Sequence, residues 1–264
     1  MRRILFAACA ALLLQPAVAV AAEHGAIEHA AADPGRSEKN RARDQYRHPV
    51  ETLAFFGVKP TDTIVEIYPS GGWYAEILAP LVRDKGTYYA ATQPPGKYRD
   101  ATVKLFESDP ARFGKAKLTI LDPSKPSEIA PPGTADAVLT FRSVHNLLMA
   151  GDAAAAQAFA DFYKALKPGG VLGVVDHRLP ETADTAREKS SGYIKQSTVV
   201  RLATAAGFKL AAESDVNANP KDTADWPDGV WTLPPSLRNG DKDRERYLAI
   251  GESDRMTLKF VKPE

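Results

Sequence analysis

The sequence predicts an α/β fold, a doubly wound sheet of about seven strands, mostly parallel, with helices on both faces and an antiparallel edge strand. The first observation is that β-forming runs alternate with segments of helical periodicity from residue 63 to residue 215. The second is that the last two predicted strands have no full helix between them, which favours antiparallel pairing at one edge. The third is size, because 264 residues, 44% of them hydrophobic, are enough for one complete core.

Residues 1–22 have the pattern of a secretory signal peptide. Arg2 and Arg3 precede an apolar run over residues 4–20, and the small residues of "AVAVAA" allow cleavage after Ala19, Ala21 or Ala22. An uncleaved membrane anchor is the alternative, although the run is short for a bilayer span. Export to a bacterial periplasm is therefore expected, with no membrane contact after cleavage. The only cysteine, Cys9, would leave with the signal, which excludes a cysteine nucleophile or a thiolate metal site in the mature chain.

The charge balance gives no indication of a polyanionic partner. The chain has 34 basic and 33 acidic residues, a formal net charge of +1. A nucleic-acid partner would normally require a basic excess, so none is expected and a small-molecule substrate is favoured.

The first half of the chain divides into a linker and three helix–strand units. Residues 23–40 are rich in Ala, Gly, Glu and His and are expected to form a flexible linker before a domain over residues 41–264. Pro49 suits the first turn of a helix that Gly57 ends. The predicted elements that follow are the strand 63–68, the helix 72–82, the strand 86–92, the helix 98–108 and the strand 117–122.

The second half continues the alternation and then changes. The predicted elements are the strand 135–142, the helix 153–166, the strand 170–177, the helix 197–207, and the strands 208–215 and 256–262. Between the last two strands lies an insertion over residues 225–247 that is rich in Trp, Pro and charge. It is expected either to cover a substrate pocket with Trp226 and Trp231 or to form a surface loop that those two rings hold in place.

The turn "YPSGG" follows the first predicted strand. Gly71 and Gly72 would let the backbone approach a ligand closely, and the next helix points its free N–H groups to the same place. In a doubly wound sheet, ligands bind outside the carboxyl ends of the strands where the strand order reverses. The turn is therefore a candidate binding site for a carboxylate or another electron-rich group, with a plain connecting turn as the alternative.

Four segments together resemble the class I S-adenosylmethionine-dependent methyltransferases, whose fold is Rossmann-like. "TIVEIYPSGGWYAEILAP" resembles their first motif, "ADAVLTFRSVHNLL" their fourth strand, "ALKPGGVLGVVDHR" their fifth strand with the preceding turn, and "LATAAGFKL" a later helix-to-strand segment. The resemblance extends from about residue 41 to residue 262. "YRHPVETLAFFGVKP", "YPSGGWY" and "GESDRMTLKFVKP" resemble, more narrowly, an exported subfamily of predicted methyltransferases.

The resemblance implies S-adenosylmethionine as the cofactor and a set of residues that would bind it. Glu66 would support the loop and the cofactor's amino end, and Asp122 matches the acidic position that contacts the adenine. The family's ribose-binding acid is missing from "YAATQPPG", where Thr92 or Gln93 could bond a hydroxyl group instead, and Trp73 stands where a third glycine is usual. The cofactor-binding residues expected on this basis are Glu66, Tyr68, Ser70, Gly71, Gly72, Thr92, Gln93, Asp122 and Arg142.

A polar cluster lies at the carboxyl ends of the fourth and fifth predicted strands, at the same edge of the predicted sheet. His145, Asp176, His177 and Arg178 are the candidate catalytic residues, because a histidine or carboxylate there could remove a proton from a methyl acceptor. The two histidines could equally be structural. Metal binding by His145, Asp176 and His177 is also possible, but neighbouring strand residues face opposite ways, which argues against one centre, and no metal is expected.

The segment "RARDQYRHP" precedes the predicted domain core and is expected to form a lid on the substrate side. Arg43, Tyr46, Arg47 and His48 are its candidate residues, together with Tyr74 after the glycine turn. The sequence thus favours methyl transfer from S-adenosylmethionine to a small molecule. A non-catalytic binding protein on the same fold and a metal-assisted enzyme are the alternatives.

Overall fold

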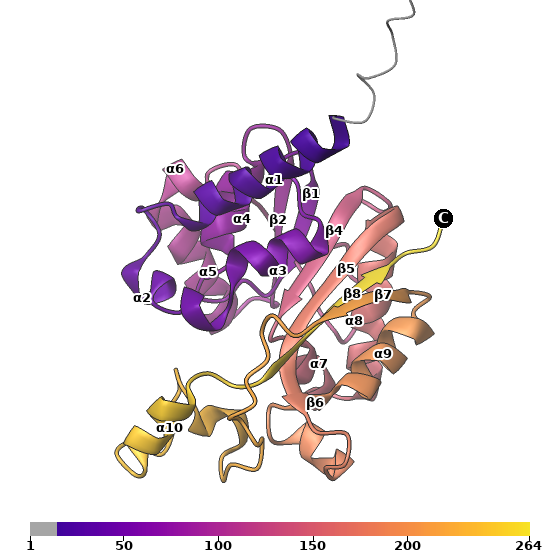
Figure 1. Cartoon of the computed structure of the whole chain (residues 1–264). Helices are drawn as coiled ribbons and strands as arrows, with labels where there is room; N and C mark the ends of the chain where they lie inside the picture. Colours follow the sequence, from indigo (N-terminus) through magenta and orange to yellow (C-terminus); the bar gives the residue numbers. More distant parts are fainter. Residues whose placement is uncertain (1–14) are drawn as a thin grey trace, which may run out of the picture.

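The computed structural model describes residues 15–264, with side chains from residue 22 onward (Figure 1). One mixed sheet forms its centre, in the order β3-β2-β1-β4-β5-β8-β7. The strands are β1 (Thr63–Ile67), β2 (Thr87–Thr92), β3 (Lys117–Ile120), β4 (Ala135–Phe141), β5 (Leu166–Leu179), β6 (Ile194–Lys195), β7 (Lys209–Ser214) and β8 (Arg255–Val261). The two-residue strand β6 pairs with the end of β5 outside this order.

The predicted doubly wound α/β fold is confirmed. Strands β3, β2, β1, β4 and β5 run parallel, as the alternation of strand and helix indicated. The antiparallel pairing expected near the edge is also present, since β7 and β8 are antiparallel to each other. Strand β8 lies one position in from the edge and pairs antiparallel with β5 as well. Its first residues therefore lie at the carboxyl end of β5.

Helices cover both faces of the sheet and bury an apolar cluster on each side (Figure 1). One face carries α7 (Val144–Met149), α8 (Asp152–Ala165) and α9 (Gln196–Ala205). The other face carries α1 (Gln15–Ala31), α3 (Pro49–Phe56), α4 (Ala75–Val82), α5 (Lys97–Ser108) and α6 (Pro110–Phe113). A third cluster lies in the 179–250 region, around Tyr193, Trp226 and Tyr247, and includes part of α10 (Arg244–Ile250). No helix within residues 15–264 has the length and apolar character needed to cross a bilayer.

The flexible linker expected over residues 23–40 is wrong. Residues 23–31 continue α1, and Ile27 is 1% exposed against α3 and α4. Arg36 is buried as well and donates hydrogen bonds to the Ala31 carbonyl and the Asp44 carboxylate. A high content of Ala and Gly suggested mobility, but Ala30 and Ala31 are buried in the apolar cluster of this face together with Ile27. Residues 1–14 of the predicted signal peptide lie outside the described part of the chain.

The N-terminal segment continues over the sheet edge in two short helices. These are α2 (Glu38–Arg41) and the 3₁₀ helix η1 (Asp44–Tyr46), and both precede α3. Two further 3₁₀ helices, η2 (Thr185–Lys189) and η3 (Gly229–Thr232), lie in the C-terminal half. Periodicity gave little indication of these elements because each is five residues or shorter.

Candidate functional site

A cavity of about 530 Å³ opens at the carboxyl ends of the parallel strands. It lies where the strand order reverses between β1 and β4, the position at which doubly wound sheets bind ligands. The candidate site residues that line it are Arg43, Arg47, Glu66, Tyr68, Ser70, Gly71, Tyr74, Gln93, Arg142, His145 and His177. The ones that do not line it are Tyr46, His48, Gly72, Thr92, Asp122, Asp176 and Arg178.

Three residues of the cavity wall have a left-handed backbone that side chains rarely adopt. Tyr68 and Ser70, on either side of Pro69, each have φ of 51°, and Arg142 at the end of β4 has φ of 58°. Such conformations cost on the order of 1 kcal/mol or more each and tend to occur at binding sites. Such residues occur in this cavity after β1 and again after β4, which supports a functional site between these two strand ends.

The two glycines of the turn have different roles. A Cβ on Gly72, whose φ is 78°, would lie 2.5 Å from Leu105 Cδ2, so this glycine lets α5 approach the turn. A Cβ on Gly71 would meet no protein atom within 4 Å, and Gly71 lines the cavity. Gly71 is therefore the position at which a ligand can approach the backbone.

Glu66 is a buried carboxyl group at the end of β1. It is 3% exposed, and the Tyr88 hydroxyl donates a hydrogen bond of 2.6 Å to its Oε2. Burial raises the pKa of Glu66 to about 8, and the Tyr88 hydrogen bond offsets only part of that effect. The group is consequently protonated at neutral pH when nothing positively charged lies beside it.

The loops after β2 and β3 differ from the acidic pattern of the resembling family. Thr92 is fully buried; its hydroxyl bonds the Thr119 carbonyl at 2.9 Å and accepts a hydrogen bond from Arg99. Gln93 lines the cavity, and its Oε1 is buried with no hydrogen-bond partner among the described residues. Asp122 has its carboxylate bonded to Ser124 and lies outside the cavity. Of these three residues, Gln93 is the one placed to accept a hydrogen bond from a ligand.

His145 and Asp176 form a buried pair beside the cavity. Asp176 Oδ1 accepts a hydrogen bond from His145 Nδ1 at 2.7 Å, which leaves Nε2 of the ring as a proton acceptor. The second carboxylate oxygen accepts from the backbone N–H groups of Val144 and His145, so Asp176 also fixes the start of α7. Asp176 is fully buried and does not line the cavity, whereas His145 does.

His177 and Arg178 follow Asp176 on β5 and have different environments. His177 lines the cavity, and its Nδ1 is bonded to Ser253. Burial, helped by His145 and the nearby arginines, lowers the pKa of His177 well below its usual value, so its ring is neutral. Arg178 points away and forms a two-bond ion pair with Asp254, at 2.8 and 2.9 Å. The expected catalytic role of Arg178 has no geometric support, because alternation along the strand turns its side chain outward.

The expected lid segment is fixed over the glycine turn by Trp73. The Trp73 indole donates a hydrogen bond of 2.6 Å to the Asn40 carbonyl, and the Arg47 guanidinium lies 4.8 Å from the ring centre. Tyr74 stacks on Phe141 with ring centres 3.4 Å apart and forms the cavity floor. Trp73 stands where the methyltransferases that the sequence resembles usually have a third glycine. Its side chain here holds the N-terminal segment in place. Tyr46 and His48 do not line the cavity.

The sequence analysis did not identify several other residues of the cavity wall. They are Asn40 on α2, Trp73 after the glycine turn, Ser143 and Asn146 at the start of α7, and Arg255 at the start of β8. The insertion, for which covering a pocket was one of the two expectations, contributes Val230, Trp231, Pro234, Pro235 and Ser236. Both readings of the insertion hold in part. Trp231 lines the cavity, whereas Trp226 packs in the third apolar cluster and donates to Asp222.

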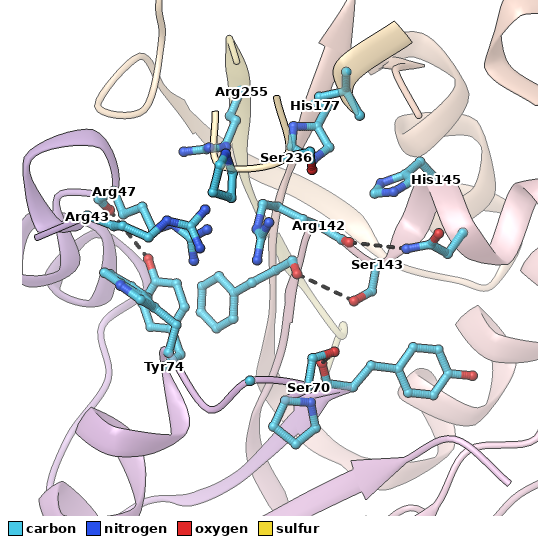
Figure 2. A pocket seen from close by; sticks show the side chains of 18 of the residues that line it. Arg43, Arg47, Ser70, Tyr74, Arg142, Ser143, His145, His177, Ser236 and Arg255 are labelled. Carbon is cyan, nitrogen blue, oxygen red and sulfur yellow. Dashed lines mark hydrogen bonds between the residues drawn. The ribbon is translucent and has the colours of Figure 1, made fainter. Parts of the chain in front are cut away.

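Four arginines face the cavity around a single paired carboxylate. Glu252, 3% exposed, forms ion pairs with Arg43, Arg47 and Arg255. Burial alone would raise the pKa of Glu252, but these three charges outweigh it and hold the pKa at about 2. Burial, followed by the charge of Arg255, lowers the pKa of Arg142 to about 10. Figure 2 shows the guanidinium groups of Arg43, Arg47 and Arg142 facing one another across the cavity.

His145, Asp176 and His177 also offer three potential metal-ligand atoms within 4.8 Å of one another. The sequence argument that Asp176 and His177 cannot approach one centre is therefore wrong in geometry. Asp176 Oδ1 turns back to accept the N–H of His177 at 2.8 Å, which brings the carboxylate close to the next side chain. Both oxygens of Asp176 already accept two hydrogen bonds each, so a metal would have to displace some of them.

Comparison with solved structures identifies the fold. The chain is similar to a SAM-dependent methyltransferase from Aquifex aeolicus, with a TM-score of 0.56 and 15% identity over 90% of this chain and 98% of that one. It is also similar to the Haloferax volcanii complex of the Trm112 methyltransferase activator and a putative methyltransferase, with a TM-score of 0.53, 17% identity, and coverage of 90% and 98%. No protein-family model and no curated protein matches the chain.

These likenesses define the class of fold, which is that of the class I S-adenosylmethionine-dependent methyltransferases. The fold also occurs in a protein whose reaction is not methyl transfer by name. The [4+2]-cyclase SpnF has a TM-score of 0.57 and 15% identity over 88% of this chain and 85% of that one. A cyclase and methyltransferases thus share the fold, so the reaction must be argued from the site itself.

Proposed function

We propose that this protein transfers a methyl group from S-adenosylmethionine to a small-molecule acceptor. The observation that carries the proposal is Gly71, a cavity-lining glycine with open space where a Cβ would be, directly after β1 at the point of strand reversal. Two further features fit the cofactor. Gln93 Oε1 is buried without a partner where a ribose hydroxyl could donate to it, and Glu66 offers a carboxyl group for the amino end.

The bound cofactor would supply an activated methyl group, and the chain's own residues would orient the acceptor and manage its proton. Asp176 holds the His145 ring with Nδ1 protonated, so Nε2 can accept a proton from an acceptor hydroxyl or amine. His177 is neutral and is positioned by Ser253 as a second polar contact. Trp231, Pro234 and Pro235 limit access of water at the rim.

The proposal extends to location. Residues 1–22 would direct export to the periplasm, as the sequence pattern predicts. Cleavage after Ala22 is compatible with the described fold, because Ala22 is exposed and the buried part of α1 begins only at Ile27.

The test is calorimetric titration of the purified protein with S-adenosylmethionine and S-adenosylhomocysteine. Micromolar binding is expected, and Gly71→Ala should weaken it at least about tenfold because the added methyl group occupies the ligand's space. Gly25→Ala is the matched control, since Gly25 also has no atom within 4 Å of a Cβ but lies on α1 away from the cavity. Absence of binding by a folded protein would refute the methyltransferase proposal.

A metal-assisted reaction remains the competing hypothesis, because three potential ligand atoms lie together. Metal analysis of the purified protein, with His145→Ala as the comparison, separates the two. One equivalent of iron or zinc that is lost in this variant would favour the metal-assisted reaction. A protein that binds neither metal nor cofactor would instead be the non-catalytic binding protein.

A further inference from the structure

The arginines of the cavity form a cluster that has more positive charge than the surrounding carboxylates can offset. The cluster consists of Arg43, Arg47, Arg142 and Arg255. Burial lowers the pKa of Arg47 well below its usual value and that of Arg142 to about 10, and a guanidinium still stays protonated at neutral pH. Glu252 pairs with three members, and Asp176 is the other carboxylate whose charge acts on Arg142. Four positive charges against two negative charges leave a net charge of +2 beside the cavity.

Several donors of this cluster are buried and unused. Arg47 is 4% exposed and Arg255 is 2% exposed. Within residues 22–264, Arg43 Nη2, Arg47 Nη2 and Arg255 Nε are buried atoms with no hydrogen-bond partner. Buried donors are normally satisfied, and one left without a partner costs about 1–3 kcal/mol, more when it is charged. All three donors belong to residues that line the cavity, which favours a ligand with acceptor oxygens.

The cluster is more than the cofactor would need. One methionine carboxylate can satisfy one or two guanidinium groups, whereas this cluster presents four from three separate segments. Figure 2 shows Ser70, at the glycine turn, on the opposite side of the Arg142 guanidinium from Arg255. Arg255 is instead the strand neighbour of His177. The cluster therefore extends from the turn toward the histidines, where the acceptor would lie.

We propose that the methyl acceptor is a small organic anion whose carboxylate or phosphate group is bound by Arg43, Arg47, Arg142 and Arg255. The role of the anion as methyl acceptor rests on the proposed function, whereas the anion-binding site itself is defined by the arginine cluster. The anion would be held between the N-terminal segment and β8, with the rest of the molecule against Trp231 and Pro235 at the rim. Its nucleophilic atom would then face the His145 side of the cavity.

The test is calorimetry with model anions on the purified protein, in the absence and presence of saturating S-adenosylhomocysteine. Benzoate and phenyl phosphate are the two anionic probes, and benzamide is the neutral probe of the same shape. We expect at least one anion to bind about tenfold or more tightly than benzamide, both with and without S-adenosylhomocysteine. The preferred anion tells whether the group recognised is a carboxylate or a phosphate.

Variants of Arg142 link the binding to the cluster, because among the described residues no carboxylate pairs with this arginine and its loss leaves the Glu252 pairs intact. Arg142→Gln should weaken the anion at least about tenfold, and Arg142→Lys should restore part of that loss. Arg41→Gln is the matched control, because Arg41 is exposed on α2 and its substitution removes the same charge.

The outcomes separate the two proposals. Anions that bind no better than benzamide overturn the inference. An Arg142→Gln protein that loses S-adenosylhomocysteine as strongly as the anion also overturns it, because the cluster would then serve the methionine carboxylate. Anion binding by a protein that ignores S-adenosylhomocysteine supports the anion site and refutes methyl transfer instead.

Discussion

Glu66→Gln is expected to make the protein more stable at alkaline pH, although it removes a group from the candidate site. Glu66 is 3% exposed, and its neighbour Tyr88 donates a hydrogen bond that a glutamine Oε1 can accept equally well. The substitution therefore keeps size, shape and hydrogen bonding and removes only the ability to ionise. Any change in the pH dependence of stability can then be assigned to this carboxyl group.

The expected size follows from the pKa of Glu66, which burial raises from 4.5 to about 8. The folded state holds a proton that the unfolded state has lost between these two pH values, so stability falls as pH rises through this window. The slope is about −1.4 kcal/mol per pH unit, and the full difference is about 5 kcal/mol. Below pH 4.5 both states are protonated and this group contributes no pH dependence.

Urea unfolding followed by circular dichroism at unit steps from pH 5 to pH 9 measures the effect. The stability of Glu66→Gln minus that of the wild type should increase with pH by several kcal/mol and level off above about pH 8. Tyr88→Phe is the companion variant. Without the hydrogen bond from Tyr88 the pKa of Glu66 should rise further, so the loss of stability of this variant should continue to a higher pH before it levels off. Parallel curves for wild type and Glu66→Gln would refute the assignment of a buried, protonated Glu66.

Three further predictions concern stability. Gly72→Ala should lower the free energy of unfolding by about 1–3 kcal/mol in chemical denaturation, because Gly72 has a positive φ and lies close to Leu105. An unchanged free energy of unfolding would contradict this close contact between the turn and α5. Glu252→Gln should cost about 3–5 kcal/mol at pH 7, because buried arginines lose their counter-charge. With a folded pKa of about 2, the stability from this carboxylate is fully present above pH 4.5 and is lost as pH falls toward 2, so the two proteins should converge in acid. Deletion of residues 1–22 should leave the unfolding temperature within about 2 °C, whereas Ile27→Asp should lower it by several times as much; equal effects would contradict the packing of α1.

The sheet and its large helices could be predicted from the sequence because periodicity is strong over long segments. The predicted strand 63–68 and helix 98–108 differ from β1 and α5 by one residue at one end. The N-terminal segment could not be predicted in the same way. Residues 23–40 have weak amphipathic character, and their burial depends on Arg36 and on contacts with α3 and α4, which are far along the chain.

The candidate site was predictable where a motif and a strand end coincide. Gly71 and His145 follow predicted strands and His177 ends one, and all three line the cavity. Whether Asp176 and Arg178 line the cavity depends instead on the direction of their side chains. Asp176 turns back to the backbone and to His145, and Arg178 reaches Asp254, which lies 76 positions away in the sequence. Sequence spacing alone does not determine such directions.

The position of the last strand could be predicted only in part. The sequence indicated antiparallel pairing with the preceding strand, and the structure adds the pairing with β5. Because β8 is antiparallel to β5, it begins at the edge where the parallel strands end, and "GESDR" therefore lies beside the candidate site. The structure pairs Arg255 with His177 and places Glu252 among the arginines. A carboxylate whose pKa is held at about 2 by three arginines, next to a fourth that it does not pair with, is a costly arrangement for a purely structural role. This cost is the reason to search first among anions for the molecule that the cavity receives.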